Sequence, residues 1–572
     1  MRKLTWRMFG ALPAMWTAAF LLWSPARVEA YSSRVHGTSS GVEIRVESLL
    51  DAVPPKGAMP LRMTVRNRSD RKGTWTFLFF GEGHWRGEQR MSSSYEMEVD
   101  AGDVKTVAWN VPVFPATAGE ARLARLYVTV SGPGSEVNRQ MLFSGGDNYS
   151  GNRAPSFVGL SEEVARRLKV DLENRTKKHN RDVAFTTLDA TYMPEDAEGL
   201  SGLDVIVMTG SEWQALSVYA DTFRRWLAAG GHLILLGESS APEFPGMGKI
   251  HALEGAGPDG NPSKLLRLLQ RVKTSQERLA DPGGYLKGDW ELRGRVPEIR
   301  RPFGVLMSLV VIMAALLGPL NLWWAFRRKR VMQLIWTTPA ISLGLSLMVG
   351  VGILFGDGFG GAGHRALQIL LLPEQRLEVK QQEQVSRTGV LWGGGFTLPP
   401  GVSIYPVKVN PGDGPDSERY MRAVDGSFGG DWFANRRIQG QVLRQVRSSR
   451  ARVAWIDGEG GAPSLRSTVD APLTRVWVRD ASGGYWTAEN VVPGREATLR
   501  RGSESEARAF LESLRLRKES VFPPGGTEGN RGWFYAEAGV TEEAYIDTLR
   551  PIRWTDEPVH LMGPLVGEGG GR

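Results

Sequence analysis

Alternating apolar and polar positions predict β structure in the N-terminal part of the chain. Short runs at residues 42–46, 61–65, 75–79, 95–99, 104–109 and 126–130 alternate with a period of two and are separated by turn residues. A period of two places every second side chain on the same face of a strand. Six or seven such runs at this spacing are typical of a β-sandwich. We therefore predict an immunoglobulin-like β-sandwich over residues 31–148, a kind of domain that usually binds or spaces other molecules.

The pattern changes near residue 150. Continuous apolar runs at residues 156–160, 183–187, 205–208 and 232–236 alternate with helical stretches, which is typical of a parallel sheet covered on both faces. Ser161 is expected to precede the first helix, and Gly230-Gly231 to end the helix before the last strand. These features predict a small α/β domain over residues 149–260. A juxtamembrane linker over residues 261–302 follows, and its leucines predict a helix that serves as a docking element, with a membrane-surface anchor as the alternative.

Two uncharged segments in the middle of the chain predict a transmembrane hairpin. Residues 303–326 and 334–356 carry no charge, and helices of that length rise by more than about 30 Å, enough to cross the hydrocarbon core. The turn between them, residues 327–333, contains Arg327, Arg328, Lys329 and Arg330. The positive-inside rule predicts that this turn lies in the cytoplasm and that both flanking parts lie on the opposite side.

The N-terminus agrees with that topology. Residues 1–30 begin with three cations, continue with an apolar run and end in Val28-Glu29-Ala30, which predicts a secretory signal peptide. An uncleaved signal anchor is the alternative, and it also exports the rest of the chain. The expected localisation is the bacterial cytoplasmic (inner) membrane, with two passes and the large domains on the periplasmic side.

The part of the chain after the hairpin is again predicted to consist mainly of β-strands. Residues 357–365 contain the spacing G-x-G-x-x-G, but no strand precedes it, so we expect a flexible glycine-rich linker and no nucleotide-binding loop. Residues 366–572 predict a β-rich exported domain with one helix, opened by a capping box from Ser503 to Glu506. Core packing accounts for most tryptophans of this domain, and a glycan- or peptide-binding face is the alternative.

Composition excludes several classes of chemistry. The chain has 572 residues and no cysteine, so disulfides, thiolate metal sites and cysteine nucleophiles are impossible. The seven histidines show no metal-ligand spacing, and we predict no metal and no cofactor.

The formal charge of the chain is +8, of which residues 1–30 contribute +3 and the membrane turn contributes +4. The exported domains are therefore close to neutral, which argues against a nucleic-acid partner.

Two stretches carry a resemblance to known families. The segment "GLDVIVMTGSEWQALSVYADTFRRWLAAGGHLILLG" resembles the class I glutamine amidotransferase-like fold, which is similar to a flavodoxin-like sheet. The stretch "LLGPLNLWWAFRRKRVMQLIWTTPAISL" resembles the membrane hairpin of uncharacterised bacterial proteins that join such a domain to two transmembrane helices. Active amidotransferases carry a cysteine after a central strand and a His-x-Glu pair, and this chain has neither. The resemblance therefore implies the fold without the activity.

The α/β fold predicts a crevice at the carboxyl ends of its strands, where such sheets bind ligands. We expect this crevice to be lined by Ser211, Glu212 and Trp213 on one side and by Glu238, Ser239 and Ser240 on the other. Helix capping by Ser211 is the structural alternative. A serine hydrolase would need a base beside Ser239, and His251 is the candidate nearest in sequence.

These observations predict a non-enzymatic, membrane-anchored protein of the cell envelope. Its expected partners are the lipid bilayer and other envelope proteins, which its exported domains would bind or scaffold. Two alternatives remain open at this stage. One is an envelope hydrolase or transferase that uses the α/β crevice, and the other is an accessory subunit of an ABC-type export system. The sequence does not identify a small-molecule or glycan ligand.

Overall fold

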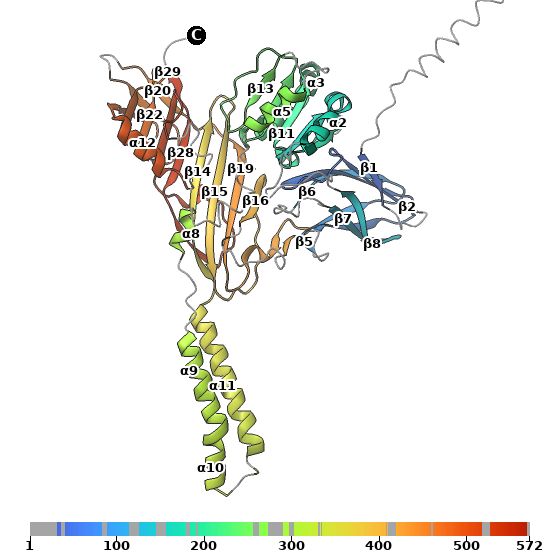
Figure 1. Ribbon diagram of the computed structural model, residues 1–572, viewed down its shortest axis with the longest axis vertical. Coiled ribbons are helices and arrows are strands. Elements are labelled where there is room, and N and C mark those ends of the chain that lie inside the picture. The colour runs from blue at the N-terminus through green and yellow to red at the C-terminus, as the bar shows by residue number, and fades with distance from the viewer. Residues whose placement is uncertain are drawn as a thin grey trace, which may run out of the picture.

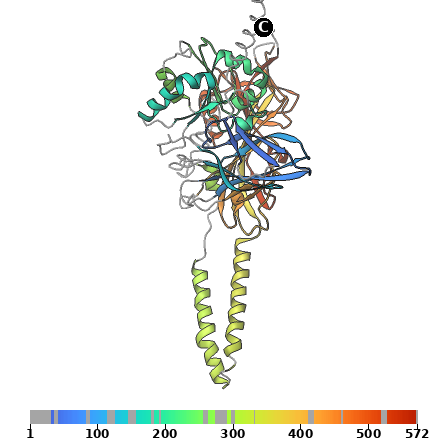
Figure 2. The same ribbon diagram turned by 90° about the vertical axis from the view of Figure 1, so that its right-hand side faces the viewer.

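The structure is a multidomain, mostly β assembly from which a pair of helices projects (Figures 1 and 2). It is a computed structural model that describes residues 31–568, apart from 36–40, 83–88, 114–124, 145–155, 179–182, 190–192, 255–261, 273–289, 297–302, 330–331, 333, 408, 410–418, 459–461 and 517–526. The predicted signal peptide, residues 1–30, and Arg330 of the predicted cytoplasmic turn lie outside the described residues.

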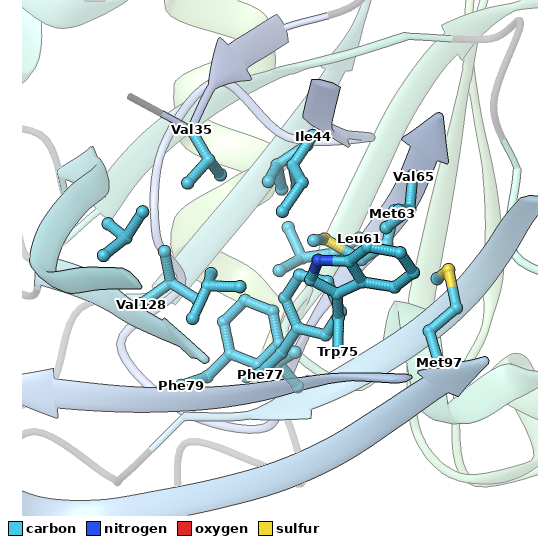
Figure 3. Close-up of a cluster of buried hydrophobic side chains, with 14 of the residues drawn as sticks. Val35, Ile44, Leu61, Met63, Val65, Trp75, Phe77, Phe79, Met97 and Val128 are labelled. Atoms are coloured by element: carbon cyan, nitrogen blue, oxygen red, sulfur yellow. The ribbon is translucent and has the colours of Figure 1, made fainter. Parts of the chain in front are cut away.

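The N-terminal part consists of two sheets that share one core. One sheet has the order β1-β2-β3-β6, and β8-β7-β4-β5 belongs to the other. The strands are β1 (Tyr31–Arg34), β2 (Val42–Ser48), β3 (Ala58–Asn67), β4 (Gly73–Glu82), β5 (Gln89–Val99), β6 (Val104–Pro112), β7 (Arg125–Gly132) and β8 (Ser135–Ser144). The alternation predicted for residues 42–46 is confirmed, because Val42, Ile44 and Val46 are buried while their neighbours are partly exposed. They join Trp75 and Phe77 in the core between the sheets (Figure 3).

The second part is a five-stranded parallel sheet in the order β10-β9-β11-β12-β13. Its elements are β9 (Ser156–Ser161), α2 (Glu162–Lys178), β10 (Val183–Leu188), β11 (Val205–Thr209), α3 (Gly210–Ala215), α4 (Ala220–Ala228), β12 (His232–Leu236), β13 (Ile250–Leu253) and α5 (Pro262–Arg271). All four predicted strands are present. The helix expected before β12 is divided, because a short 3-10 turn separates α3 from α4. Gly230 follows α4 with φ +108°, a backbone conformation that favours glycine.

The boundary of this α/β unit differs from the prediction. The sequence placed its end at residue 260, but Leu265, Leu266 and Leu269 of α5 are buried in one apolar cluster with α2 and the sheet. Helix α5 therefore completes the covering of that face, and the unit extends to Val272. The expected docking role of these leucines is confirmed.

The C-terminal part contains a ten-stranded sheet and a smaller four-stranded one. Their strands are β14 (Gly361–Leu372), β15 (Leu377–Thr388), β16 (Val402–Val407), β19 (Ile438–Ser448), β20 (Val453–Ile456), β21 (Ser464–Ser467), β22 (Leu473–Arg479), β23 (Tyr485–Val491), β24 (Glu496–Thr498), β25 (Arg500–Arg501), β26 (Trp533–Ala538), β27 (Ile552–Asp556), β28 (Val559–Pro564) and β29 (Val566–Glu568). The helix α12 (Glu504–Ser513) begins with the predicted capping box, in which Ser503 and Glu506 bond each other's backbone.

The predicted glycine-rich linker over residues 357–365 is wrong. Strand β14 begins at Gly361 and pairs with β15 and β27 from its first residue. A Cβ at Gly361 would lie 2.7 Å from the carbonyl oxygen of Arg387, and one at Gly363 would lie 2.6 Å from the Trp554 ring. These glycines allow close packing of strands and side chains, so their abundance does not signal a free linker.

The projecting hairpin consists of α9 (Phe303–Ala315), a π-helical turn (Leu316–Leu320), α10 (Asn321–Arg327) and α11 (Leu334–Asp357). Among the described residues, one helical stretch, Val310–Arg327, is long and apolar enough to cross a membrane, and Leu334–Met348 is apolar but shorter. Asn321 links the two arms, since it donates to Thr338 Oγ1 at 3.0 Å and accepts from Thr337 Oγ1 at 3.1 Å.

Contacts between the parts join them into one body. The loop after β2 enters the α/β unit, where Lys56 Nζ lies 3.1 Å from Asp204 Oδ1 and both side chains are almost fully buried. Two short strands of the C-terminal part, β17 (Tyr420–Arg422) and β18 (Phe428–Gly430), extend an N-terminal sheet beyond β5. The sequence-based boundaries did not anticipate this sharing of a sheet.

We expect the free energy of unfolding to depend on pH because of Glu198, which lies where parts of the molecule meet. Glu198 Oε1 of the α/β unit lies 3.8 Å from Arg422 Nη1. Burial raises the pKa of Glu198 from 4.5 to about 7, Arg422 opposes this rise, and Asp196 adds to it. A carboxyl whose pKa is raised by folding stabilises the folded state when protonated, so stability is lost as pH rises through about 7. We expect the free energy of unfolding to fall by about 2–3 kcal/mol between pH 4.5 and 8.

This prediction can be checked by urea denaturation at several pH values. Glu198→Gln should remove most of the dependence, and Glu512→Gln, an exposed site on α12, should not. A Glu198→Gln protein that keeps the wild-type slope would assign the effect to other groups.

Candidate functional site

The structure places both halves of the predicted crevice at the carboxyl ends of neighbouring strands. Ser211, Glu212 and Trp213 follow β11, and Glu238, Ser239 and Ser240 follow β12. The two segments touch, because the Glu238 carboxyl group occupies the space that a Cβ on Gly210 would take. The two segments are therefore adjacent in the structure, and a ligand crevice between them stays a prediction.

Glu212 and Trp213 of the first segment are engaged in structural contacts. Thr209, and not Ser211, caps α3, and Glu212 completes the capping box. Glu212 Oε2 also accepts a hydrogen bond of 2.6 Å from Ser161 Oγ. Trp213 packs edge-on against Phe223, with ring centroids 5.1 Å apart. The first half of the crevice thus connects α3 to the start of α2 and to α4.

His251 does not lie near Ser239, so the expected nucleophile and base do not form a pair. His251 Nε2 is 3.4 Å from Nδ1 of His232, the first residue of β12, whereas Ser239 follows the last residue of that strand. A five-residue strand extends over about 13 Å, which separates the two ends of the sheet. Burial lowers the pKa of His232 to about 4 and also lowers that of His251, so at neutral pH the two rings are neutral and share a hydrogen bond.

A spacious cavity lies elsewhere, in the C-terminal domain. Its volume is about 640 Å³. Its floor comes from alternate residues of β14, β15 and β28, which share one face of the large sheet. The floor residues are Ile369, Leu371, Glu378, Lys380, Val559 and Leu561. Its rim comes from residues 449–451, 468–471 and 539–544, which connect strands.

The cavity combines an apolar floor with charges of both signs. Glu378 and Lys380 are each 4% exposed, and Glu378 forms an ion pair with Arg447. Lys380 Nζ donates to the Ala544 carbonyl oxygen at 2.8 Å. Burial lowers the pKa of Lys380, Arg447 adds to this effect, and Glu378 opposes it. Such a surface suits a ligand with apolar parts and polar groups better than a uniformly charged one.

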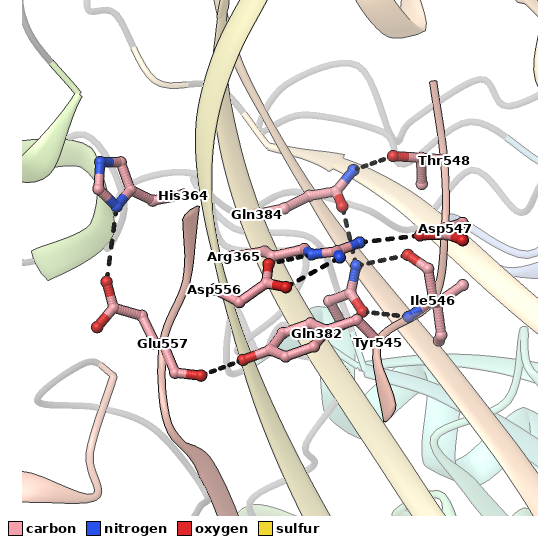
Figure 4. A network of polar contacts seen from close by, with 10 residues as sticks. All are labelled: His364, Arg365, Gln382, Gln384, Tyr545, Ile546, Asp547, Thr548, Asp556 and Glu557. Carbon is pink, nitrogen blue, oxygen red and sulfur yellow. Dashed lines mark hydrogen bonds and ion pairs between the residues drawn. The ribbon is translucent and has the colours of Figure 1, made fainter. Parts of the chain in front are cut away.

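A polar network holds one wall of the cavity in place (Figure 4). Gln382 donates to the Ile546 carbonyl oxygen at 2.9 Å and accepts from the Ile546 N–H at 2.7 Å. Gln384 bonds Thr548 Oγ1 at 3.4 Å. Alternate side chains of β15, from Lys380 to Gln384, therefore bind residues 544–548 along the face of the sheet. Because residues 541–544 of the rim precede this bound segment directly, their position is set by it.

Arg365 of β14 anchors the same segment. Its guanidinium group makes two hydrogen bonds to Asp556, one of them 3.1 Å long, and lies 3.2 Å from Asp547 Oδ1. The guanidinium carbon is 4.6 Å from the centroid of the Tyr545 ring. Asp547 and Tyr545 belong to the bound segment, so Arg365 ties it to β14 and β27 (Figure 4).

Sequence reasoning missed this site because its lining comes from distant strands. One signal was available: the run from Lys380 to Gln384, Lys-Gln-Gln-Glu-Gln, lies inside a strand that is buried on both faces. Consecutive buried polar side chains need specific partners, so such a run indicates a polar network.

No family model matches this chain, and no curated protein matches it. Among solved structures it is similar to a Paenibacillus sp. cycloisomaltooligosaccharide glucanotransferase (TM-score 0.16, 12% identity, 33% of this chain and 27% of that one). It is also similar to Bacteroides uniformis β-glucuronidase 2 (TM-score 0.16, 11% identity, 35% and 34%) and to a β-glucuronidase from glycoside hydrolase family 2 (TM-score 0.18, 8% identity, 92% and 62%). The chain thus spans about a third or less of the length of the first two. TM-scores this low establish no shared fold, and no activity is carried over to this chain.

Proposed function

We propose that the protein is a non-enzymatic, two-pass protein of the bacterial cytoplasmic membrane whose exported body binds another envelope component in the cavity of the C-terminal domain. One observation carries this proposal. The helical hairpin stands clear of the body, and the chain enters and leaves it at the body end, with cations at the far tip (Figures 1 and 2).

The hairpin surface supports insertion into a bilayer. Large apolar side chains are exposed along both arms, among them Val311, Ile312, Trp336, Leu343 and Leu347. Leaving so many apolar side chains in water is unfavourable, whereas lipid accommodates them. Helix α11 has 24 residues, a rise of about 36 Å, which suffices to span the hydrocarbon core.

The hairpin tip supports the orientation. Arg327 and Arg328 lie over the rings of Trp323 and Trp324, at 5.2 and 4.5 Å from the centroids, and Lys329 forms the turn with φ +51°. Charged groups are costly inside a bilayer, so the tip is expected to emerge on the far side, where the positive-inside rule favours the cytoplasm.

For the domains we propose the finer folds that the sequence suggested. The two N-terminal sheets with their shared core support an immunoglobulin-like sandwich. In chain order the parallel sheet reads 2-1-3-4-5, which is the flavodoxin-like order and supports an amidotransferase-like unit. The lack of cysteine and the separation of His251 from Ser239 favour a binding role over catalysis for this unit.

Topology can be tested with single cysteines, since the natural chain has none. We expect Ser217→Cys and Ser482→Cys to react with an impermeant maleimide on intact spheroplasts, and Lys329→Cys to react only after permeabilisation. Reaction at 329 alone would reverse the orientation, and reaction at all three sites would show that the hairpin does not cross the membrane.

Binding in the cavity can be tested by photo-crosslinking in intact cells. A crosslinking amino acid at Arg450, on the rim, should give a specific adduct, and the same group at the exposed Arg508 of α12 should not. Ala471→Trp, which fills the cavity mouth, should remove most of the adduct. Equal adducts at both sites, or an adduct that survives Ala471→Trp, would argue against a binding cavity.

A further inference from the structure

The chain that leaves the hairpin is fastened to the body within three residues. Helix α11 ends at Asp357, and Phe359 forms a bridge with Val390 in the loop after β15. Three backbone hydrogen bonds support the bridge: from Val390 N to Gly358 O at 2.9 Å, from Gly360 N to Val390 O at 3.0 Å, and from Gly389 N to Gly360 O at 2.7 Å. The loop that follows β15 is therefore held beside the first residues outside the hairpin.

Among the described residues of the body, this loop carries the most exposed phenylalanine or tryptophan side chain. Trp392 is 85% exposed and Phe359 is 57% exposed, and outside the hairpin they are the two exposed phenylalanine or tryptophan side chains among the described residues. Both lie in the same bridge region. Other aromatic side chains close by, such as Trp432 and Phe433, are buried in an apolar cluster. An exposed pair at one place on an otherwise well-packed body indicates contact with something apolar.

The loop presents Trp392 on a rigid base. Leu391 next to it is buried in the same cluster as Trp432, and its N–H donates to Asn435 Oδ1 at 2.6 Å. Gly393 follows with φ +87°, so the chain turns directly after the tryptophan. These contacts fix the backbone at Trp392 and therefore the direction in which its side chain leaves the chain.

We propose that Phe359 and Trp392 form an aromatic foot that rests in the headgroup region of the bilayer leaflet on the side of the body. The inference rests on the proposed membrane insertion of the hairpin. Phe359 lies four residues beyond Phe355, a reach of at most about 14 Å, so it is close to the end of the membrane-spanning part. Tryptophan rings favour this interface, where the ring contacts lipid and the indole N–H reaches water. Two points of attachment, hairpin and foot, would fix the orientation of the body and hold the cavity away from the membrane.

Strand β14 sets the distance between the aromatic foot and the cavity. Strand β14 runs from Gly361 at the foot to Ile369 and Leu371 in the cavity floor. Eight residues of strand extend over about 27 Å. The foot thus makes β14 a spacer between the membrane and the candidate binding site.

The test uses the full-length chain in lipid nanodiscs with a fluorescent probe on single cysteines. Trp392→Cys carries the test probe, Val218→Cys on the α/β unit is the matched exposed control at 81% exposure, and Leu343→Cys reports on the hairpin. Lipids with a nitroxide in the headgroup region should quench the probe at 392 at least about threefold more than the probe at 218, as expected for a ring at the interface. Lipids with a nitroxide deep in the acyl chain should quench the probe at 343.

The outcomes separate the two proposals. Quenching at 343 with equal, weak quenching at 392 and 218 would overturn the aromatic foot and leave membrane insertion standing. Absence of deep quenching at 343 would overturn the proposed topology itself. Because position 392 is exposed, the variant should keep the wild-type melting temperature, which excludes misfolding as the cause of either result.

Discussion

Replacing Arg365 by methionine should destabilise the body by about 3–5 kcal/mol, because it leaves Asp556 as a mostly buried carboxylate without its cation. The side chains of Arg365 and Asp556 are 7% and 13% exposed. The same guanidinium group contacts Asp547 and packs on Tyr545, so its loss should also weaken the attachment of residues 545–547 to the sheet.

Urea denaturation of the full-length protein in detergent measures the effect. The matched control is Arg508→Met, which breaks an exposed ion pair with Glu504 on α12 and should cost less than about 1 kcal/mol. The double variant Arg365→Met/Asp556→Leu should recover part of the loss, since neither charge is then buried alone. A single variant no less stable than the control would mean that Asp556 is well solvated without Arg365.

The parts of the fold that follow local apolar patterns could be predicted from sequence. Strand β2 and the four strands from β9 to β12 appear within one or two residues of their predicted places. In each case the alternation or the continuous apolar run reports the environment of the strand directly. The hairpin was equally readable, because its helices are apolar on all sides.

The missed features depend on contacts between distant segments. Strands β17 and β18 join a sheet of the N-terminal part through pairing of Tyr420 with Met91, which no local pattern reveals. Gly361 and Gly363 at the start of β14 suggest a linker in the sequence, because the contacts that require them, with Arg387 and Trp554, come from distant segments.

The candidate crevice illustrates the same limit. Strand order placed Ser211 and Ser239 correctly at adjacent strand ends. The expected partner His251 was judged by its distance in sequence, but β13 runs parallel to β12 and pairs His251 with Ile234, before the carboxyl end. Parallel pairing separates residues that follow each other closely along the chain.

Trp290→Ala should destabilise the protein by about 3–5 kcal/mol, because it removes a buried aromatic ring and a donor to a buried carboxylate. Trp290 is 1% exposed and precedes the short helix α8 (Glu291–Arg295), close to the hairpin in sequence. Its Nε1 donates to Glu383 Oε2 at 2.8 Å in the middle of β15. The ring also packs against Gly440 of β19, where a Cβ would lie 2.6 Å from it.

Trp290 connects the segment before the hairpin to the rest of the body. Gln381 donates a hydrogen bond to Glu383. Arg444 donates to Gln381 and also to the Ala229 carbonyl oxygen of the α/β unit, at 2.7 Å. A chain of polar contacts thus runs from the segment before the hairpin across the large sheet. Loss of the Trp290 contacts should expose the segment around Val296 to protease while the hairpin helices stay folded.

Two variants separate the contributions of the ring and the hydrogen bond. Trp290→Phe keeps most of the packing and removes the N–H, so it should cost about 1–3 kcal/mol, well below the alanine variant. Trp392→Phe, at an exposed tryptophan, is the control and should leave the urea midpoint unchanged. If Trp290→Phe lowered the free energy of unfolding as much as Trp290→Ala, the hydrogen bond to Glu383 would contribute more than the packing of the ring. The segment around Trp290 would then be held mainly by that hydrogen bond. If both variants matched the control and the segment stayed resistant to protease, α8 would be held by its other contacts, of which the ion pair between Arg295 and Glu557 is the first to test.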